Sequence, residues 1–96
     1  MIERYKKSVE LDPTDADAWI NLGDAYYDIS RYDEAIDAYQ KAIEISPYYS
    51  EVWNNLGLSY SMKRDYQNAI RCYLKALELD PEDAVSYYNL GFAYEE

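Results

Sequence analysis

The sequence repeats itself at a fixed interval. The same spacing separates Pro13 from Pro47 and Pro47 from Pro81, and it recurs between Gly23, Gly57 and Gly91. When residues 16–49 are aligned with 50–83, 13 of the 34 positions are identical, whereas chance would give about two at typical residue frequencies. A fixed period of this length is typical of repeat architectures, in which each unit buries its apolar face against its neighbours.

Each period contains two segments with helical spacing of apolar residues. Trp19, Leu22, Gly23 and Tyr26 fall at i, i+3, i+4 and i+7, and a second segment from Tyr32 to Ile43 continues this rhythm. The prolines end the second segment of each period, because proline has no N–H to donate. The pattern predicts an all-α solenoid of stacked antiparallel helix pairs. We expect helices near 2–12, 16–29, 32–46, 50–63, 66–80 and 84–95.

Local residue choices agree with these helices. Asp15 and Asp83 stand just before predicted helix starts, where a carboxylate caps free backbone N–H groups. Gly23 and Gly57 fall in the middle of helices, where glycine costs about 1 kcal/mol relative to alanine. We interpret both glycines as sites where the paired helix approaches closely.

The repeated residues resemble the tetratricopeptide repeat family. The W-x2-L-G-x2-Y pattern with later Ala, aromatic, Ala and Pro occurs in full twice, in 16–49 and in 50–83. Residues 1–15 resemble the second helix of a preceding repeat, and 84–96 resemble the first helix of a following one. The resemblance implies a right-handed superhelix whose first-type helices line a concave groove. Where this family often has glycine between the two helices, the chain has Ser30 and Arg64, which predicts modest strain if that turn needs a positive φ.

Composition excludes several function classes. With 9 Lys and Arg against 19 Asp and Glu, the net charge is −10, which disfavours nucleic acid and anionic membranes as partners. The chain has no His and one cysteine, Cys72, so a Ser-His-Asp triad and an internal disulfide are impossible. We therefore expect no enzymatic activity, no metal and no cofactor. The absence of disulfides, of a signal-like apolar run and of a membrane-length apolar window predicts a cytoplasmic protein.

In the tetratricopeptide family, groove residues occupy fixed positions on the first helix of each repeat. Six of the corresponding residues here are acidic and none is basic, so the resemblance implies a partner peptide that carries Lys or Arg among apolar residues. The acids near helix starts have an alternative role, because they complement the helix dipole. The corresponding residues are Asp17, Ile20, Asn21, Asp24, Tyr27, Asp28, Glu51, Asn54, Asn55, Leu58, Ser61, Met62, Val85, Tyr88, Asn89, Phe92, Glu95 and Glu96.

Asn21, Asn55 and Asn89 form a ladder with one amide per repeat. These amides either hydrogen-bond the backbone of an extended peptide or serve solvated or interhelical roles. Family members that hold the acidic tails of heat-shock chaperones need Lys and Arg in the groove. This chain has none there, so we do not expect it to bind chaperone tails.

Aromatic residues divide into two groups. We expect most tyrosines to pack between helices, and Tyr27, Tyr88 and Phe92 to point into the groove as apolar anchors. Tyr48 and Tyr49, in the loop after Pro47, either pack on the neighbouring repeat or form an exposed patch.

The register of the helices gives an alternative function. The chain starts on a second-type helix and ends on a first-type helix, so each terminal helix lacks one neighbour. Tyr5 and Val9 at one end, and Leu90 and Tyr94 at the other, form the predicted apolar end faces. Such ends either stack head to tail between chains, as a self-assembling structural module, or meet further repeats of a longer array.

Overall fold

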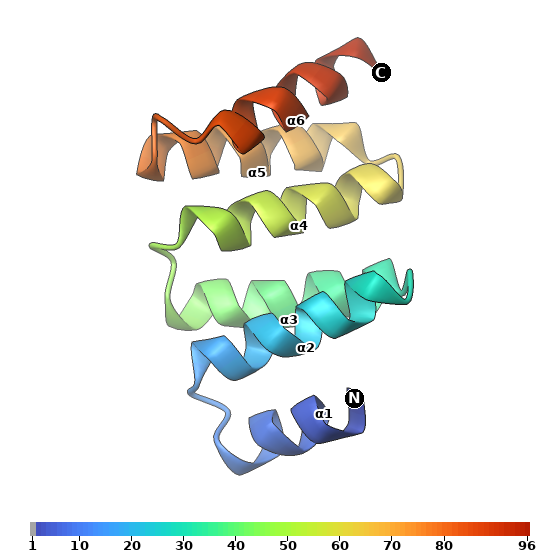
Figure 1. Cartoon of the computed structure of the whole chain (residues 1–96), viewed down its shortest axis with the longest axis vertical. Coiled ribbons are helices and arrows are strands. Elements are labelled where there is room, and N and C mark those ends of the chain that lie inside the picture. Colours follow the sequence, from blue (N-terminus) through green and yellow to red (C-terminus); the bar gives the residue numbers. More distant parts are fainter. Residues whose placement is uncertain (1) are drawn as a thin grey trace.

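In the computed structural model, which describes residues 2–96, the chain folds into six α-helices with no strand. The helices run antiparallel to their sequence neighbours and stack along one long axis, with α1 and α6 at opposite ends (Figure 1). The stack measures 40 × 25 × 17 Å. Every helix starts at the predicted residue and ends within one residue of the predicted end, which confirms the all-α solenoid. The bounds are α1 Ile2–Leu11, α2 Ala16–Asp28, α3 Tyr32–Ile45, α4 Ser50–Met62, α5 Tyr66–Leu79 and α6 Ala84–Glu95.

Both predicted caps are present. The Asp15 carboxylate accepts hydrogen bonds from the backbone N–H groups of Asp17 and Ala18 at the start of α2, at 3.1 and 3.4 Å. Asp83 does the same at the start of α6, with Val85 at 3.1 Å and Ser86 at 3.2 Å. These bonds satisfy amide groups that have no partner within the first helical turn.

The turns inside the two complete repeats have the same strained geometry. Ser30 has a φ of 63° and Arg64 a φ of 64°, which is the left-handed region that costs a residue with a Cβ about 1 kcal/mol. In each turn the N–H of the next residue donates across the helix end, from Arg31 to the Tyr26 carbonyl and from Asp65 to the Tyr60 carbonyl, both at 2.9 Å. Arg64 therefore carries the predicted strain so that the helix carbonyls remain paired.

Glycine is required where α2 and α4 meet their partner helices. A Cβ added to Gly23 would lie 2.6 Å from Cε1 of Tyr39, and one added to Gly57 would lie 2.5 Å from Cε1 of Tyr73. Both tyrosines are only 1% exposed. The predicted close approach is confirmed at these two glycines. In α6 the third glycine, Gly91, has no neighbour within 4 Å of an added Cβ.

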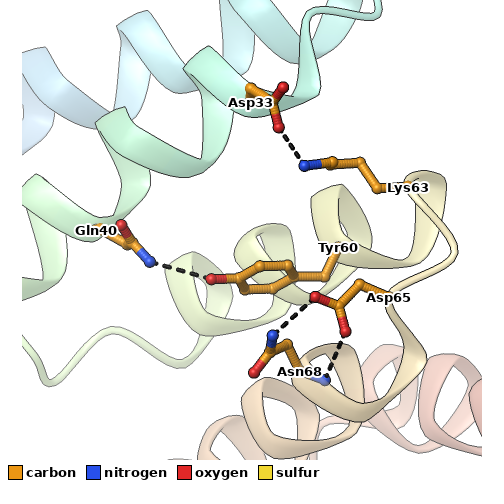
Figure 2. A network of polar contacts seen from close by, with 6 residues as sticks. All are labelled: Asp33, Gln40, Tyr60, Lys63, Asp65 and Asn68. Atoms are coloured by element: carbon orange, nitrogen blue, oxygen red, sulfur yellow. Dashed lines mark hydrogen bonds and ion pairs between the residues drawn. The ribbon is translucent and has the colours of Figure 1, made fainter.

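Polar contacts join successive repeats next to the apolar core. Gln40 on α3 donates from Nε2 to the Tyr60 hydroxyl on α4 at 3.0 Å, and Lys63 after α4 pairs with Asp33 on α3 (Figure 2). Below Tyr60, the Asp65 carboxylate accepts from the Asn68 side chain at 2.7 Å. The first two contacts join α3 to α4 and the turn after it, whereas the Asp65–Asn68 contact is local to the start of α5.

Candidate functional site

Charge is segregated between the two kinds of helix. The first-type helices α2, α4 and α6 contain five acidic residues and no Lys or Arg, as their sequences show. Within residues 2–96, the four ion pairs join residues of α3, α5 and the turns between helices. The carboxylates of the first-type helices therefore have no basic partner among the described residues. They are Asp17, Asp24, Asp28, Glu51 and Glu95.

A cavity of about 250 Å³ lies between α2, α3 and α4 and gathers part of the predicted groove. Five of its six lining residues are predicted groove residues from two successive repeats. The sixth is Tyr39, which we expected only to pack between helices. Its hydroxyl end reaches the cavity because the ring crosses Gly23. The lining residues are Asp24, Tyr27, Asp28, Tyr39, Asn55 and Leu58.

The carboxylate of Asp24 is the most perturbed acid of this cavity. Desolvation raises its pKa above the usual value, the nearby Asp28 charge adds to this, and a hydrogen bond from the Tyr39 hydroxyl opposes it. Desolvation and the bond to Asp24 also raise the pKa of Tyr39, so this tyrosine stays protonated and donates. An incoming cation would stabilise the Asp24 carboxylate, because opposite charge favours the ionised form.

The three asparagines of the ladder have different environments. Asn21 is exposed, and Asn55 is half-buried in the wall of the cavity. Asn89 instead donates from Nδ2 to Oδ1 of Asn54 at 3.0 Å, across the contact between α4 and α6. Only Asn55 therefore lines the cavity, and Asn89 serves an interhelical role.

Asn54 differs from its predicted place in the open groove. It is 7% exposed, and its oxygen also faces the Ser86 hydroxyl at 3.4 Å. A buried amide needs such partners, because an unpaired buried polar group is costly. Asn54 therefore joins α4 to α6 and is not available to a ligand.

The other predicted groove residues lie outside the cavity. Asp17 and Glu51 are exposed in the first turns of α2 and α4, where they also complement the helix dipoles. Ile20 packs on the apolar core, whereas Met62 is 52% exposed. On α6, Tyr88 and Phe92 are exposed and line a separate hollow of about 310 Å³ with Tyr87, Gly91 and Glu95.

The predicted end residues have unequal exposure. Val9 is buried and Tyr5 half-buried against α2, and Leu90 packs on the cluster around Tyr73, so only Tyr94 is largely exposed, at 62%. The prediction of an apolar face at both ends is therefore wrong for Val9, which lies under α2. The exposed residues of α1 are charged except for Leu11, and they comprise Glu3, Arg4, Lys6, Lys7, Glu10 and Leu11.

The remaining candidate residues are the cysteine and the two tyrosines of the loop after Pro47. Cys72 is buried, and desolvation, helped by the Asp65 charge, raises its pKa to about 12. Tyr48 and Tyr49 are 79% and 48% exposed, which favours the exposed-patch interpretation.

Among residues 2–96 no group of side chains is arranged to hold a metal ion. In the same part of the chain, every helix is too short or too polar to span a bilayer.

Comparison with known proteins gives family and structural matches. Two family models described as tetratricopeptide repeat match residues 14–82 and 72–96. Two crystal structures of MamA superpose on 98% of this chain with TM-scores of 0.95, at 31% and 38% identity. This chain spans about half of those chains, 55% and 51%.

A third neighbour is an NMR structure of the second TPR domain of human RPAP3 in complex with the HSP70 peptide SGPTIEEVD. Its TM-score is 0.95 at 23% identity, and the match covers 99% of this chain and 79% of that one. At this level of identity the likeness shows the fold alone. No curated protein matches this chain by sequence.

Proposed function

The chain belongs to the tetratricopeptide repeat family, and we propose that it is a non-catalytic interaction module that binds an extended basic-apolar peptide in the groove of α2, α4 and α6. The observation that carries the proposal is the cavity of Asp24, Asp28 and Asn55, in which two carboxylates have no basic partner among the described residues. A cationic side chain supplies the charge that this cavity lacks.

The cavity offers three kinds of contact to such a peptide. Asp24 and Asp28 would pair with the ammonium or guanidinium group of a Lys or Arg. The Asn55 amide would hydrogen-bond the peptide backbone, since it both donates and accepts. Tyr27 and Leu58 would contact the apolar part of the ligand, and the Tyr27 ring face attracts a nearby cation.

The charge of the groove argues against the kind of ligand seen in the RPAP3 complex. The peptide in that structure, SGPTIEEVD, contains three acidic residues and no basic one. Binding such a peptide here would place acids next to Asp24 and Asp28, and like charges in contact are unfavourable. The shared fold supports peptide binding, and the acidic cavity favours a basic peptide over an acidic one.

Calorimetry with the whole chain tests the proposal. We expect a short peptide with one Lys between apolar residues to bind weakly, with an affinity that falls as salt rises. Asp24→Asn should weaken binding about 3- to 10-fold, which corresponds to about 1 kcal/mol for a partly exposed charged contact. Asp37→Asn is the matched control, because it removes the same charge from an exposed position on α3. Equal effects of the two substitutions would show that only net charge matters and would refute the groove.

A second candidate function, self-association, is favoured by the exposed face of α6. A helix that is apolar all round is normally buried, yet α6 exposes Tyr87, Tyr88, Phe92 and Tyr94 by 49–77%. Apolar surface of this kind marks an interaction site. We propose that the exposed apolar face of α6 is the surface through which the chain self-associates. The outer face of α1 is mostly charged and is a less suitable contact surface.

A further inference from the structure

Two buried tyrosines occupy equivalent places in the two complete repeats, but their hydroxyl groups have different partners. Tyr73 stands one repeat period after Tyr39, and both residues are 1% exposed. The Tyr73 hydroxyl lies 3.1 Å from the hydroxyl of Ser61. The Tyr39 hydroxyl instead donates to Oδ1 of Asp24. The first complete repeat therefore joins a buried donor to a carboxylate of the proposed groove.

The Tyr39 hydroxyl is held in place by the packing of its ring. The ring lies so close to Gly23 that a Cβ added there would be 2.6 Å from Cε1. Because protein interiors are close-packed, such an enclosed ring has little room to move when a ligand arrives. Oδ1 of Asp24 therefore already accepts a hydrogen bond before a ligand binds, and Oδ2 is the oxygen left for the ligand.

A second carboxylate follows one helical turn later in α2. Asp28 is exposed and lines the same cavity as Asp24, and residues four apart on a helix share a face, with Cβ atoms about 5–6 Å apart. The α4 side of the cavity contributes Asn55 and Leu58, which carry no charge. A ligand therefore meets two acidic groups on neighbouring turns, and the half-buried one offers it a single oxygen.

The two basic side chains bind carboxylates in different ways. A guanidinium group binds best as a planar fork that donates to both oxygens of one carboxylate. An ammonium group is a compact charge with three donors, so it can bind one oxygen from each of two carboxylates. The pair of Asp24 and Asp28 suits the ammonium group, because the Tyr39 hydroxyl already uses one of the two oxygens that a fork needs.

We infer that the groove selects Lys over Arg, and that Tyr39 sets this preference by occupying Oδ1 of Asp24. The inference rests on the peptide groove proposed above and names the side chain that the groove takes. Tyr39 is a positioning residue, because it acts on the ligand through Asp24. An Arg side chain is left with the carboxylate of Asp28, which is exposed, and ion pairs in contact with solvent contribute little.

Calorimetry with the whole chain and two peptides that differ only in a central Lys or Arg tests the inference. We expect the wild type to bind the Lys peptide about threefold more tightly, which is the scale of one partly exposed charged contact. Tyr39→Phe should remove this difference by strengthening the binding of the Arg peptide, because both oxygens of Asp24 become available. Tyr73→Phe is the matched control, because it removes the equivalent buried hydroxyl, whose partner is Ser61, and it should keep the preference of the wild type.

An NMR titration of the side-chain carboxyl groups separates positioning from a purely structural role. Burial raises the pKa of Asp24, and the hydrogen bond from Tyr39 lowers it. Tyr39→Phe should therefore raise the Asp24 pKa further, because a hydrogen bond to the charged form is lost. Tyr73→Phe should leave the Asp24 pKa unchanged. Circular dichroism of each variant monitors the fold.

Asp28→Asn gives a comparison that leaves the buried ring intact. It should weaken the Lys peptide more than the Arg peptide, since only the ammonium group uses both carboxylates, and an equal loss for the two peptides would overturn the inference. Equal affinities of the wild type for the two peptides, or a Lys preference that survives in Tyr39→Phe, would also overturn it and leave the groove in place. A wild type that binds neither peptide would refute the groove itself and the inference with it.

Discussion

Replacing Gly57 by alanine tests whether close helix contact outweighs helix propensity in the middle of α4. The new Cβ would lie 2.5 Å from Cε1 and 2.8 Å from Cδ1 of Tyr73, whereas carbon atoms in contact are about 3.5–4.0 Å apart. By that comparison the ring must move by about 1 Å. It has little room to do so, because Tyr73 is 1% exposed and its hydroxyl is hydrogen-bonded to Ser61.

The magnitude follows from two opposing effects. Overpacking of this kind costs about 1–3 kcal/mol, with a fully buried ring at the upper end, and exchanging a mid-helix glycine for alanine returns about 1 kcal/mol. We expect a net loss of about 2 kcal/mol in the free energy of unfolding. For a domain of this size, that loss lowers the Tm by about 8–16 °C.

Urea unfolding of Gly57→Ala and Gly91→Ala, followed at a concentration where the chain is monomeric, gives the comparison. The substitution and the repeat position are the same, but Gly91 has open space where Gly57 has Tyr73. Gly91→Ala should be equal to the wild type or more stable, by up to about 1 kcal/mol. A Gly57→Ala variant at least as stable as the wild type would refute the argument from close approach.

Three further predictions concern strain, pH and the thiol. Arg64→Gly should raise the free energy of unfolding by about 0.5–1 kcal/mol, because its φ of 64° suits glycine; calorimetric unfolding that gives a lower Tm would contradict this. Asp24→Asn should become more stable relative to the wild type as the pH rises from about 3 to 7, measured by urea unfolding at each pH. The sign follows because burial raises the Asp24 pKa above 3.8, so the folded chain holds that proton more tightly than the unfolded chain and loses stability on ionisation. Cys72, with a pKa of about 12 in the fold, should react with a thiol reagent at pH 8 at least about tenfold more slowly than in urea; equal rates would show that the thiol is accessible.

The helices and their pairing were predictable from sequence because each contact is local to one repeat or to its neighbour. The mid-helix glycines Gly23 and Gly57 predicted a close approach of the paired helix, and the structure shows Tyr39 and Tyr73 at these two places. The caps at Asp15 and Asp83 were equally predictable, since they involve only the next three residues. In a regular array, the same short-range contacts recur in each repeat.

The candidate site was less predictable because it depends on contacts between different repeats. Asn54 and Asn89 pair across α4 and α6, and the spacing within one helix does not show such a bond. The hydrogen bond from the Tyr39 hydroxyl to Asp24 was also not predicted from the sequence. Helical spacing places the Tyr39 ring in the core but does not show where its hydroxyl group lies. Val9 became buried for a related reason, since α2 covers the inner face of α1.

An NMR titration of the isotope-labelled chain is the sharpest test of a groove that is selective for cationic peptides. Two peptides of equal length and apolar content, one with a central Lys and the other with Glu, are titrated in turn. We expect the Lys peptide to shift the amide signals of Asp24, Asp28, Asn55 and Leu58, which line one cavity, and the Glu peptide to leave them in place. Shifts caused equally by both peptides, or confined to residues outside that cavity, would rule out a groove of this kind.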